Sequence, residues 1–273
     1  MPRNLFEVSQ KVRLNVLKIS KLANKGHIGS GLSICEIVVA ILAVAKGVGS
    51  EDNDRTRIVL SKGHAALAYY SGLAEFGIIS KDELETYCVN GSRFGTHPDR
   101  IQQGTDFMTG SLGQGIGFGV GCAMAAKIQQ REAQTFVVLS DSELNEGSTW
   151  ESLYVAGHHN LKSLVVILDL NGQQAMGKTK DVLGMDGVPN QLEMVGWNCL
   201  SLDGHDAEVL VQALSRKMDD KSKPLLVIAK TTAGKGVSFM EGKVEWHYLP
   251  QTEEQHRVAI AEVSGLRSKA RAK

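Results

Sequence analysis

Two apolar segments of the sequence each end in a side chain that can bind a hard cation. They are Thr135-Phe-Val-Val-Leu-Ser-Asp141 and Leu164-Val-Val-Ile-Leu-Asp-Leu-Asn171. An uninterrupted apolar run is typical of a strand that is buried on both faces of a parallel sheet. Ligands of such sheets bind beyond the carboxyl ends of the strands, where Asp141 and Asn171 fall. Because Mg²⁺ takes oxygen ligands and needs only one or two carboxylates beside phosphate oxygens, the pairing predicts a magnesium diphosphate site.

Each of these two residues also has a simpler interpretation when it is taken alone. Asp141 is well placed to cap a helix that opens near Asn145, and Asn171 is a typical turn residue before Gly172. Motifs elsewhere in the chain favour the cation site over both interpretations.

Several histidine- and glycine-containing motifs occur in a fixed order along the chain. They are Gly26-His-Ile-Gly-Ser-Gly-Leu-Ser33, Ser61-Lys-Gly-His-Ala65, Thr96-His-Pro-Asp99, Thr109-Gly-Ser-Leu-Gly-Gln-Gly115, Asp141 to Glu146-Gly147, Asn171, and Lys230-Thr-Thr-Ala-Gly-Lys-Gly236 with Trp246-His247. In this order and spacing they resemble the N-terminal, diphosphate-binding half of the transketolase family. One glycine-rich match would be weak evidence, whereas an ordered series is specific.

The resemblance implies a cofactor and a set of ligands for it. The cofactor is thiamine diphosphate with Mg²⁺, for which Ca²⁺ or Mn²⁺ are alternatives. The implied metal ligands are Asp141, Asn171 and the carbonyl group of Gln173. The implied cofactor contacts are His64, Gly110, Leu112, Asp141, Ser142, Glu146, Asn171 and His247.

The resemblance also implies catalytic roles for His27, His97 and His247. They would line the donor-sugar site, bind the hydroxyl groups of a ketose and help to move protons. Imidazole suits these tasks because it donates or accepts a proton near neutral pH. A solvated loop histidine is the alternative for His27 or His97 considered alone. Glu146 would lie near a subunit contact, and its alternative is a carboxylate that is favoured by a helix N-terminus.

The chain departs from the family pattern in two respects. The metal aspartate lies in Ser140-Asp141-Ser142, where the family has Gly-Asp-Gly, so a phosphate contact of the second glycine depends on the backbone that Ser142 adopts. The family's pyrimidine-binding domain, with the glutamate that pairs with the cofactor's aminopyrimidine, has no counterpart in these residues. We therefore expect the partner to be a separate pyrimidine-domain subunit, in an α2β2 heterotetramer.

The expected activity is transfer of a two-carbon ketol unit from a ketose phosphate to an aldose phosphate by the two subunits together. Two other interpretations stay open. The chain is part of a thiamine diphosphate enzyme that acts on a modified or sulfonated sugar, or it is a non-catalytic paralogue that binds a diphosphate.

The elements that must position these residues follow from the hydrophobic pattern. Strands at 57–60, 135–140, 164–170, 197–201 and 225–230 alternate with helices near 145–159, 188–195 and 206–217. This alternation predicts an α/β fold with a mostly parallel sheet and helices on both faces, and the resemblance implies the diphosphate-binding type of the thiamine diphosphate fold. Further helices are expected at 5–24, after capping boxes at Ser33 and Ser80, and at 113–130, where small residues allow close packing and suggest a subunit interface. Residues 1–265 would form one domain, followed by a basic, disordered tail at 266–273.

Composition excludes several other classes of protein. The 30 basic and 30 acidic residues balance and form no basic stripe, so neither nucleic acid nor an anionic membrane is an expected partner. The four cysteines form no C-x-x-C pair, which argues against a zinc site and a disulfide framework. No apolar run is long enough for a membrane span and no signal sequence is seen, so we expect a cytoplasmic protein.

Overall fold

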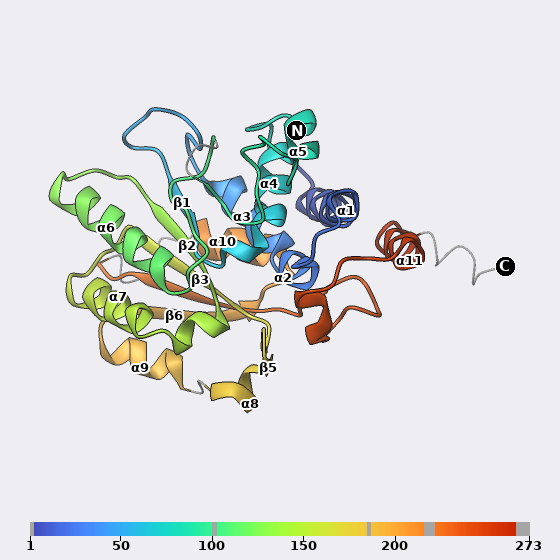
Figure 1. Cartoon of the computed structure of the whole chain (residues 1–273). Coiled ribbons are helices and arrows are strands. Elements are labelled where there is room, and N and C mark those ends of the chain that lie inside the picture. The colour runs from blue at the N-terminus through green and yellow to red at the C-terminus, as the bar shows by residue number, and fades with distance from the viewer. Residues whose placement is uncertain (1–2, 100–102, 185–186, 216–221, 266–273) are drawn as a thin grey trace.

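Five parallel strands form the central sheet in the order β1-β2-β3-β7-β6 (Figure 1). The computed structural model describes residues 3–99, 103–184, 187–215 and 222–265. In the pairing of β2 with β3, Ser140 lies opposite Asp169, so the carboxyl ends of these two strands finish side by side. The strands are β1 (Arg57–Leu60), β2 (Thr135–Ser140), β3 (Leu164–Leu170), β6 (Asn198–Asp203) and β7 (Leu225–Lys230).

Helices cover both faces of this sheet and give the molecule three layers (Figure 1). The apolar core on one face includes α3 (Cys35–Val44), α4 (Ala66–Glu75) and α10 (Ala207–Ser215), and α1 (Leu5–Ala23) packs against α3 and α4. The other face packs against α6 (Gln114–Ile128), α7 (Gly147–His158) and α9 (Val188–Met194).

Side chains of β2 alternate between the two cores. Phe136 and Val138 point into the first, and Val137 and Leu139 into the second. Each strand residue is therefore buried on one side or the other, which explains the uninterrupted apolar run in the sequence. The predicted α/β fold with a parallel sheet is confirmed.

Short elements make up the rest of the described chain. They are α2 (Ile28–Ser33), α5 (Lys81–Glu85), α8 (Thr179–Leu183), α11 (Glu253–Val263), the 3₁₀ turns η1 (Gly63–Ala65), η2 (Asp141–Asn145) and η3 (Val244–His247), and the hairpin of β4 (Gln173–Gln174) with β5 (Gly177–Lys178). Most of them lie in the connections that surround the carboxyl ends of the strands.

One of the two predicted capping boxes is correct. Ser80 Oγ accepts a hydrogen bond from the Glu83 amide at 3.1 Å, and Glu83 accepts one from the Ser80 amide at 2.9 Å. The capping box predicted at Ser33 is wrong, because Ser33 is the last residue of α2 and its hydroxyl donates to the Ser30 carbonyl group and to Asp169. Glu36 does not complete such a box, since its carboxylate binds Arg13 at 2.9 Å.

Other expectations concern surfaces and termini. The basic segment 266–273 lies outside the described residues. The described cysteines are all free, and none of the described helices is both long and apolar enough to cross a membrane.

Candidate active site

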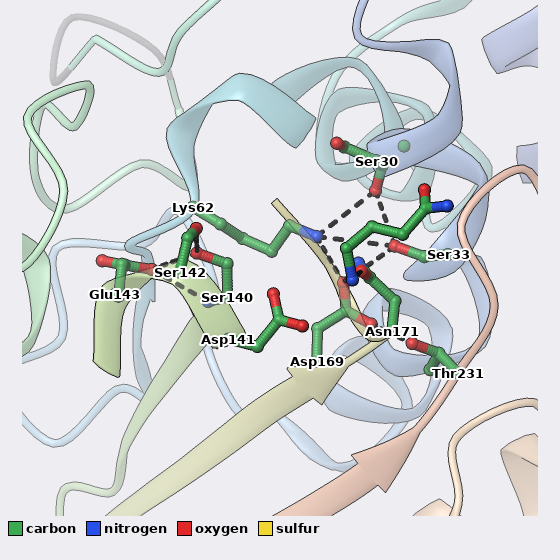
Figure 2. A network of polar contacts seen from close by, with 12 residues as sticks. Ser30, Ser33, Lys62, Ser140, Asp141, Ser142, Glu143, Asp169, Asn171 and Thr231 are labelled. Atoms are coloured by element: carbon green, nitrogen blue, oxygen red, sulfur yellow. Dashed lines mark hydrogen bonds and ion pairs between the residues drawn. The ribbon is translucent and has the colours of Figure 1, made fainter. Parts of the chain in front are cut away.

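Asp141 lies directly after β2, with its carboxylate directed across the end of β3 (Figure 2). Its Oδ2 atom accepts hydrogen bonds from the Gly172 amide at 2.9 Å and from Thr179 Oγ1 at 2.7 Å. Its Oδ1 atom is buried and has no hydrogen-bond partner. Burial, together with the nearby Asp169, raises the pKa of Asp141 to about 6. Because an unpartnered buried carboxylate oxygen is costly, this atom is a ready ligand for a cation.

Asn171 and Gln173 supply further oxygen atoms beside Asp141. Asn171 Nδ2 donates to Asp169 Oδ2 at 3.0 Å, and Asn171 Oδ1 accepts from the Gln173 amide at 2.9 Å. Within the described residues, no three His, Cys, Asp or Glu side chains are grouped as a metal site. The donors present are instead one carboxylate, one amide and one backbone carbonyl, which suit Mg²⁺ when phosphate oxygens and water complete its shell.

Four histidines gather over this set of oxygens from four separate segments. The ring centroids of His64 and His247 are 5.1 Å apart, and those of His27 and His247 are 5.3 Å apart. His97 lies 6.0 Å from His27. His64, His247, Ser142, Asn171 and Gln173 line one pocket, together with Gly29, Ser30, Lys62, Ser140, Gln174, Ala233 and Lys243.

The backbone around His27 is held in an unusual conformation. His27 has a φ of 60°, in the left-handed region, and its amide donates to the His247 carbonyl group at 3.1 Å. The preceding Gly26 lies so close to Tyr248 that a Cβ atom there would be 2.1 Å from the Tyr248 carbonyl oxygen. A non-glycine residue at positive φ costs free energy, and such strain concentrates at functional sites.

All four imidazoles favour the neutral form. Burial lowers the pKa of His27 and His97, and in His27 the neighbouring His97 contributes as well. Burial and the Lys62 charge hold the pKa of His64 well below its ordinary value. Burial and the neighbouring His27 lower the pKa of His247 to about 4. At neutral pH each ring can therefore donate through one nitrogen and accept through the other.

The other residues predicted to contact the cofactor lie around the four histidines and differ in how far they are buried. Gly110 is exposed beside His97, where a Cβ atom would lie 3.6 Å from the ring. Leu112, in the same loop, is half-buried. Glu146 is exposed at the start of α7. Among the described residues that line the pocket with His64 and His247, Ser142 is present but Leu112 and Glu146 are not.

The two serines beside Asp141 have an ordinary backbone. Ser140 has a φ of −92°, and neither serine is among the described residues with positive φ. Their hydroxyl oxygens are 2.9 Å apart, and Ser140 Oγ also donates to Glu143 at 3.3 Å. Serine therefore fits where the family pattern has glycine, and it brings a hydroxyl group to the pocket wall.

Comparison with known proteins places this geometry in a family. Residues 6–267 match the family profile described as "Transketolase, thiamine diphosphate binding domain". The chain belongs to the transketolase family. It is 35% identical over 259 residues to the A subunit of the apulose-4-phosphate transketolase of Phocaeicola vulgatus, covering 94% of this chain and 92% of that protein. It is 34% identical over 255 residues to a 6-deoxy-6-sulfo-D-fructose transketolase subunit of Clostridium sp., covering 92% of each.

Solved structures of transketolases share the fold. The transketolase of Campylobacter jejuni superposes with a TM-score of 0.89 at 30% identity, over 97% of this chain and 43% of that one. The chain thus spans less than half the length of the transketolase chains of known structure that it matches. The thiamine diphosphate-binding fold predicted from the motifs is confirmed.

Three buried residues of this transketolase-family domain were not singled out from the sequence. Glu143 accepts hydrogen bonds from the Ser140 amide at 2.9 Å and the Gly113 amide at 3.0 Å, so it ties the loop that carries Gly110 to the end of β2. Its position three residues after Ser140 is a capping-box signal that the sequence contains. Lys62 and Asp169, the other two, carry no comparable signal, because their pairing joins residues that are distant in sequence.

Proposed function

We propose that this chain is the N-terminal subunit of a two-component transketolase that depends on thiamine diphosphate and Mg²⁺. With a pyrimidine-domain partner it would transfer a two-carbon ketol unit from a ketose phosphate to an aldose phosphate. The observation that carries the proposal is the buried, unpartnered Oδ1 atom of Asp141, whose carboxylate is hydrogen-bonded to the Gly172 amide between Asn171 and Gln173. A site that had lost its cofactor would gain stability by filling or pairing this oxygen.

In this proposal Asp141, Asn171 and the Gln173 carbonyl group hold the metal against the diphosphate. His64 and His247 donate to diphosphate oxygens, and Ser142 adds a hydroxyl donor. The backbone amides at the start of α7 provide the partial positive charge of a helix N-terminus. These donors and the metal together neutralise a group that carries several negative charges.

Thiamine diphosphate, when bound, supplies the carbon nucleophile that attacks the carbonyl group of a ketose. The histidines of this chain would position the sugar for that attack. His27, His97 and His247 have lowered pKa values, so their rings are neutral and can bind hydroxyl groups of the sugar as donors or acceptors. A neutral ring can also take up a proton from one sugar hydroxyl group and return it to another. The backbone of His27, at positive φ, is tied to His247 by the hydrogen bond from its amide to the His247 carbonyl group.

The partner would complete the site from the exposed side. Gly110 and Leu112 would contact the aminopyrimidine, whose activating glutamate belongs to the partner subunit. Glu146, exposed at the start of α7, would lie near the contact between subunits. We propose an α2β2 heterotetramer, and the word "subunit" in the names of both bacterial relatives supports a partner.

The same relatives support a second candidate for the substrate. One is named for apulose-4-phosphate, and the other for a fructose with a sulfonate at carbon 6. A modified or sulfonated ketose is therefore an alternative donor to an ordinary ketose phosphate. The oxygen ligands and histidines of this chain would act on the cofactor and on hydroxyl groups close to the reacting carbonyl, which both kinds of ketose share.

Reconstitution tests the proposal directly. The chain is mixed with its pyrimidine-domain partner, thiamine diphosphate, Mg²⁺ and a ketose labelled with ¹³C at its two transferred carbons, and the products are analysed by mass spectrometry. The label should appear in a product two carbons longer than the aldose acceptor. Asp141→Ala should abolish the transfer, whereas His158→Ala, on the exposed end of α7, should leave it unchanged. No labelled product from any ketose would favour the non-catalytic paralogue.

A further inference from the structure

A fully buried ion pair lies beneath the proposed metal site. Lys62 Nζ contacts Asp169 Oδ2, and both side chains are 0% exposed (Figure 2). Burying two charges costs so much solvation that apolar replacements of similar volume are often as stable or more stable. The ion pair therefore contributes little to the stability of the fold, and its contacts indicate another role.

Asp169 is the centre of a network that joins four segments. Its Oδ2 atom accepts hydrogen bonds from Ser33 Oγ at 2.8 Å and Asn171 Nδ2 at 3.0 Å, as well as from Lys62. Its Oδ1 atom accepts one from Thr231 Oγ1. With four donors around it, this carboxylate has a single defined position at the end of β3.

This network determines how the Asn171 amide is turned. Asp169 Oδ2 accepts a hydrogen bond from the side-chain nitrogen of Asn171. The backbone N–H of Gln173 donates to the side-chain oxygen of Asn171 at 2.9 Å. A flipped Asn171 would set its oxygen against the Asp169 carboxylate and its NH₂ group against the N–H of Gln173. Both contacts would be repulsive, so the oxygen of Asn171 stays available as a ligand.

Lys62 belongs to the network mainly through Asp169. Its other two contacts, to the Ser30 carbonyl oxygen and Ser33 Oγ, are long at 3.5 Å and 3.4 Å. Its positive charge offsets the negative charge of Asp169, which lies close to Asp141 and contributes to the raised pKa of that carboxyl. Without Lys62, two uncompensated carboxylates would face each other at the ends of β2 and β3.

We propose that Lys62 and Asp169 are a positioning pair that fixes Asn171 with its oxygen toward the divalent cation. The inference rests on the proposed function, because it assumes that Asn171 is a metal ligand. It adds two residues that act on the metal through another side chain.

The test replaces the whole pair by apolar residues of similar size. Lys62→Met with Asp169→Leu should still fold, because neither charge is left unpaired. Its melting temperature should be lowered, because Ser33, Asn171 and Thr231 lose the acceptor that Asp169 provides. The Mg²⁺ concentration needed for half-maximal binding of thiamine diphosphate, measured by calorimetry with the partner present, should rise about 10- to 100-fold.

A rescue variant separates positioning from a general structural effect. Adding Asn171→Asp to the double variant supplies a ligand with two equivalent oxygens, so its orientation no longer matters. Mg²⁺ dependence should return to within about threefold of the wild type. Arg55→Met with Asp106→Leu removes an ion pair at the amino end of β1 and should lower the melting temperature without changing the Mg²⁺ dependence.

The outcomes distinguish failure of the positioning role from failure of the proposed function. Equal Mg²⁺ dependence in the wild type and the double variant would overturn the positioning role alone. Loss of binding that Asn171→Asp does not restore would also overturn it, because Lys62 would then act directly on the diphosphate. Absence of Mg²⁺-dependent binding by the wild type would overturn the proposed function and this inference together.

Discussion

The unpartnered oxygen of Asp141 should have a measurable effect on the ligand-free protein. The pKa of Asp141 is raised from 3.8 to about 6, so folding favours the protonated carboxyl. The stability that this group contributes is complete below the lower value and is lost as the pH rises through the higher one. A difference of about two pKa units corresponds to at most about 3 kcal/mol.

Asp141→Asn should therefore stabilise the ligand-free chain at neutral pH. The free energy of unfolding, measured with urea from about pH 4 to pH 8, should fall with pH more steeply in the wild type than in the variant. Near pH 8 the variant should be more stable by up to about 3 kcal/mol, and it should not bind Mg²⁺ with thiamine diphosphate. Parallel stability curves for the two proteins would contradict an uncompensated carboxylate at this position.

His27 allows a separate test of catalytic function, because its backbone conformation can be preserved. Asparagine tolerates positive φ better than most residues, so His27→Asn keeps the strained turn and removes the imidazole. In the reconstituted complex kcat should fall by about 10²- to 10⁴-fold, the range for a lost general acid or base, with little change in cofactor affinity.

The control for this prediction is His158→Ala, an exposed histidine at the end of α7. It should leave both kcat and cofactor affinity unchanged. If His27→Asn instead lowered the melting temperature and kept kcat, the histidine would have a structural role.

At the residue scale, motif resemblance singled out histidines and oxygen-bearing residues that the structure groups together, but not the buried residues that hold them in place. His64 and Asp141 stand in recognisable motifs, and the structure brings them to one end of the sheet. Lys62 lies within such a motif, yet its ion-pair partner is Asp169, which is more than a hundred positions away in sequence. Local patterns carry no information on that contact, which arises only from the register of β3 and the connection after β1.

Helix α6 lies beside α7 on one face of the sheet (Figure 1) and contains glycines in two different environments, one packed against the sheet and one open. A Cβ atom on Gly119 would lie 2.3 Å from Val137 Cγ2 on the sheet, whereas one on Gly121 would meet nothing within 4 Å. Gly119 permits close packing inside the subunit. Gly121 is exposed and serves no contact within the described chain, which fits the expected subunit interface on this face.

Two alanine variants of α6 test that interface. Gly119→Ala should destabilise the isolated chain by about 1–3 kcal/mol, as overpacking does. Gly121→Ala should stabilise it by about 0.5–1 kcal/mol, because alanine is the better helix former. If a partner subunit packs closely on this face, Gly121→Ala should nevertheless weaken assembly, as measured by analytical ultracentrifugation. Assembly as tight as that of the wild type would place the interface elsewhere.

At the element scale, periodicity predicted the sheet and most helices, and local capping signals were less reliable. The capping box predicted at Ser33 was wrong because both side chains that would form it bind residues distant in sequence. Ser33 donates to Asp169, and Glu36 accepts from Arg13. Helix α11 was not predicted, although Thr252 and Gln255 form a complete capping box there. A capping pattern is thus informative only where no stronger partner competes for its residues.

The whole molecule presents the proposed site at the carboxyl ends of the strands, with Gly110 and Glu146 exposed beside it. Such an arrangement would supply the metal ligands, the diphosphate donors and the sugar-binding histidines. Under the proposed function, the aminopyrimidine and its activating glutamate depend on the second subunit of the complex. Cofactor affinity should therefore depend strongly on the partner.

Isothermal titration calorimetry of thiamine diphosphate with Mg²⁺, on the chain alone and with its pyrimidine-domain partner, tests this dependence most directly. We predict binding that appears or tightens at least about tenfold when the partner is added, a gain of about 1.4 kcal/mol or more. The gain should vanish in Asp141→Ala. Binding in neither case would contradict the proposed function and identify the chain as a non-catalytic member of the transketolase family.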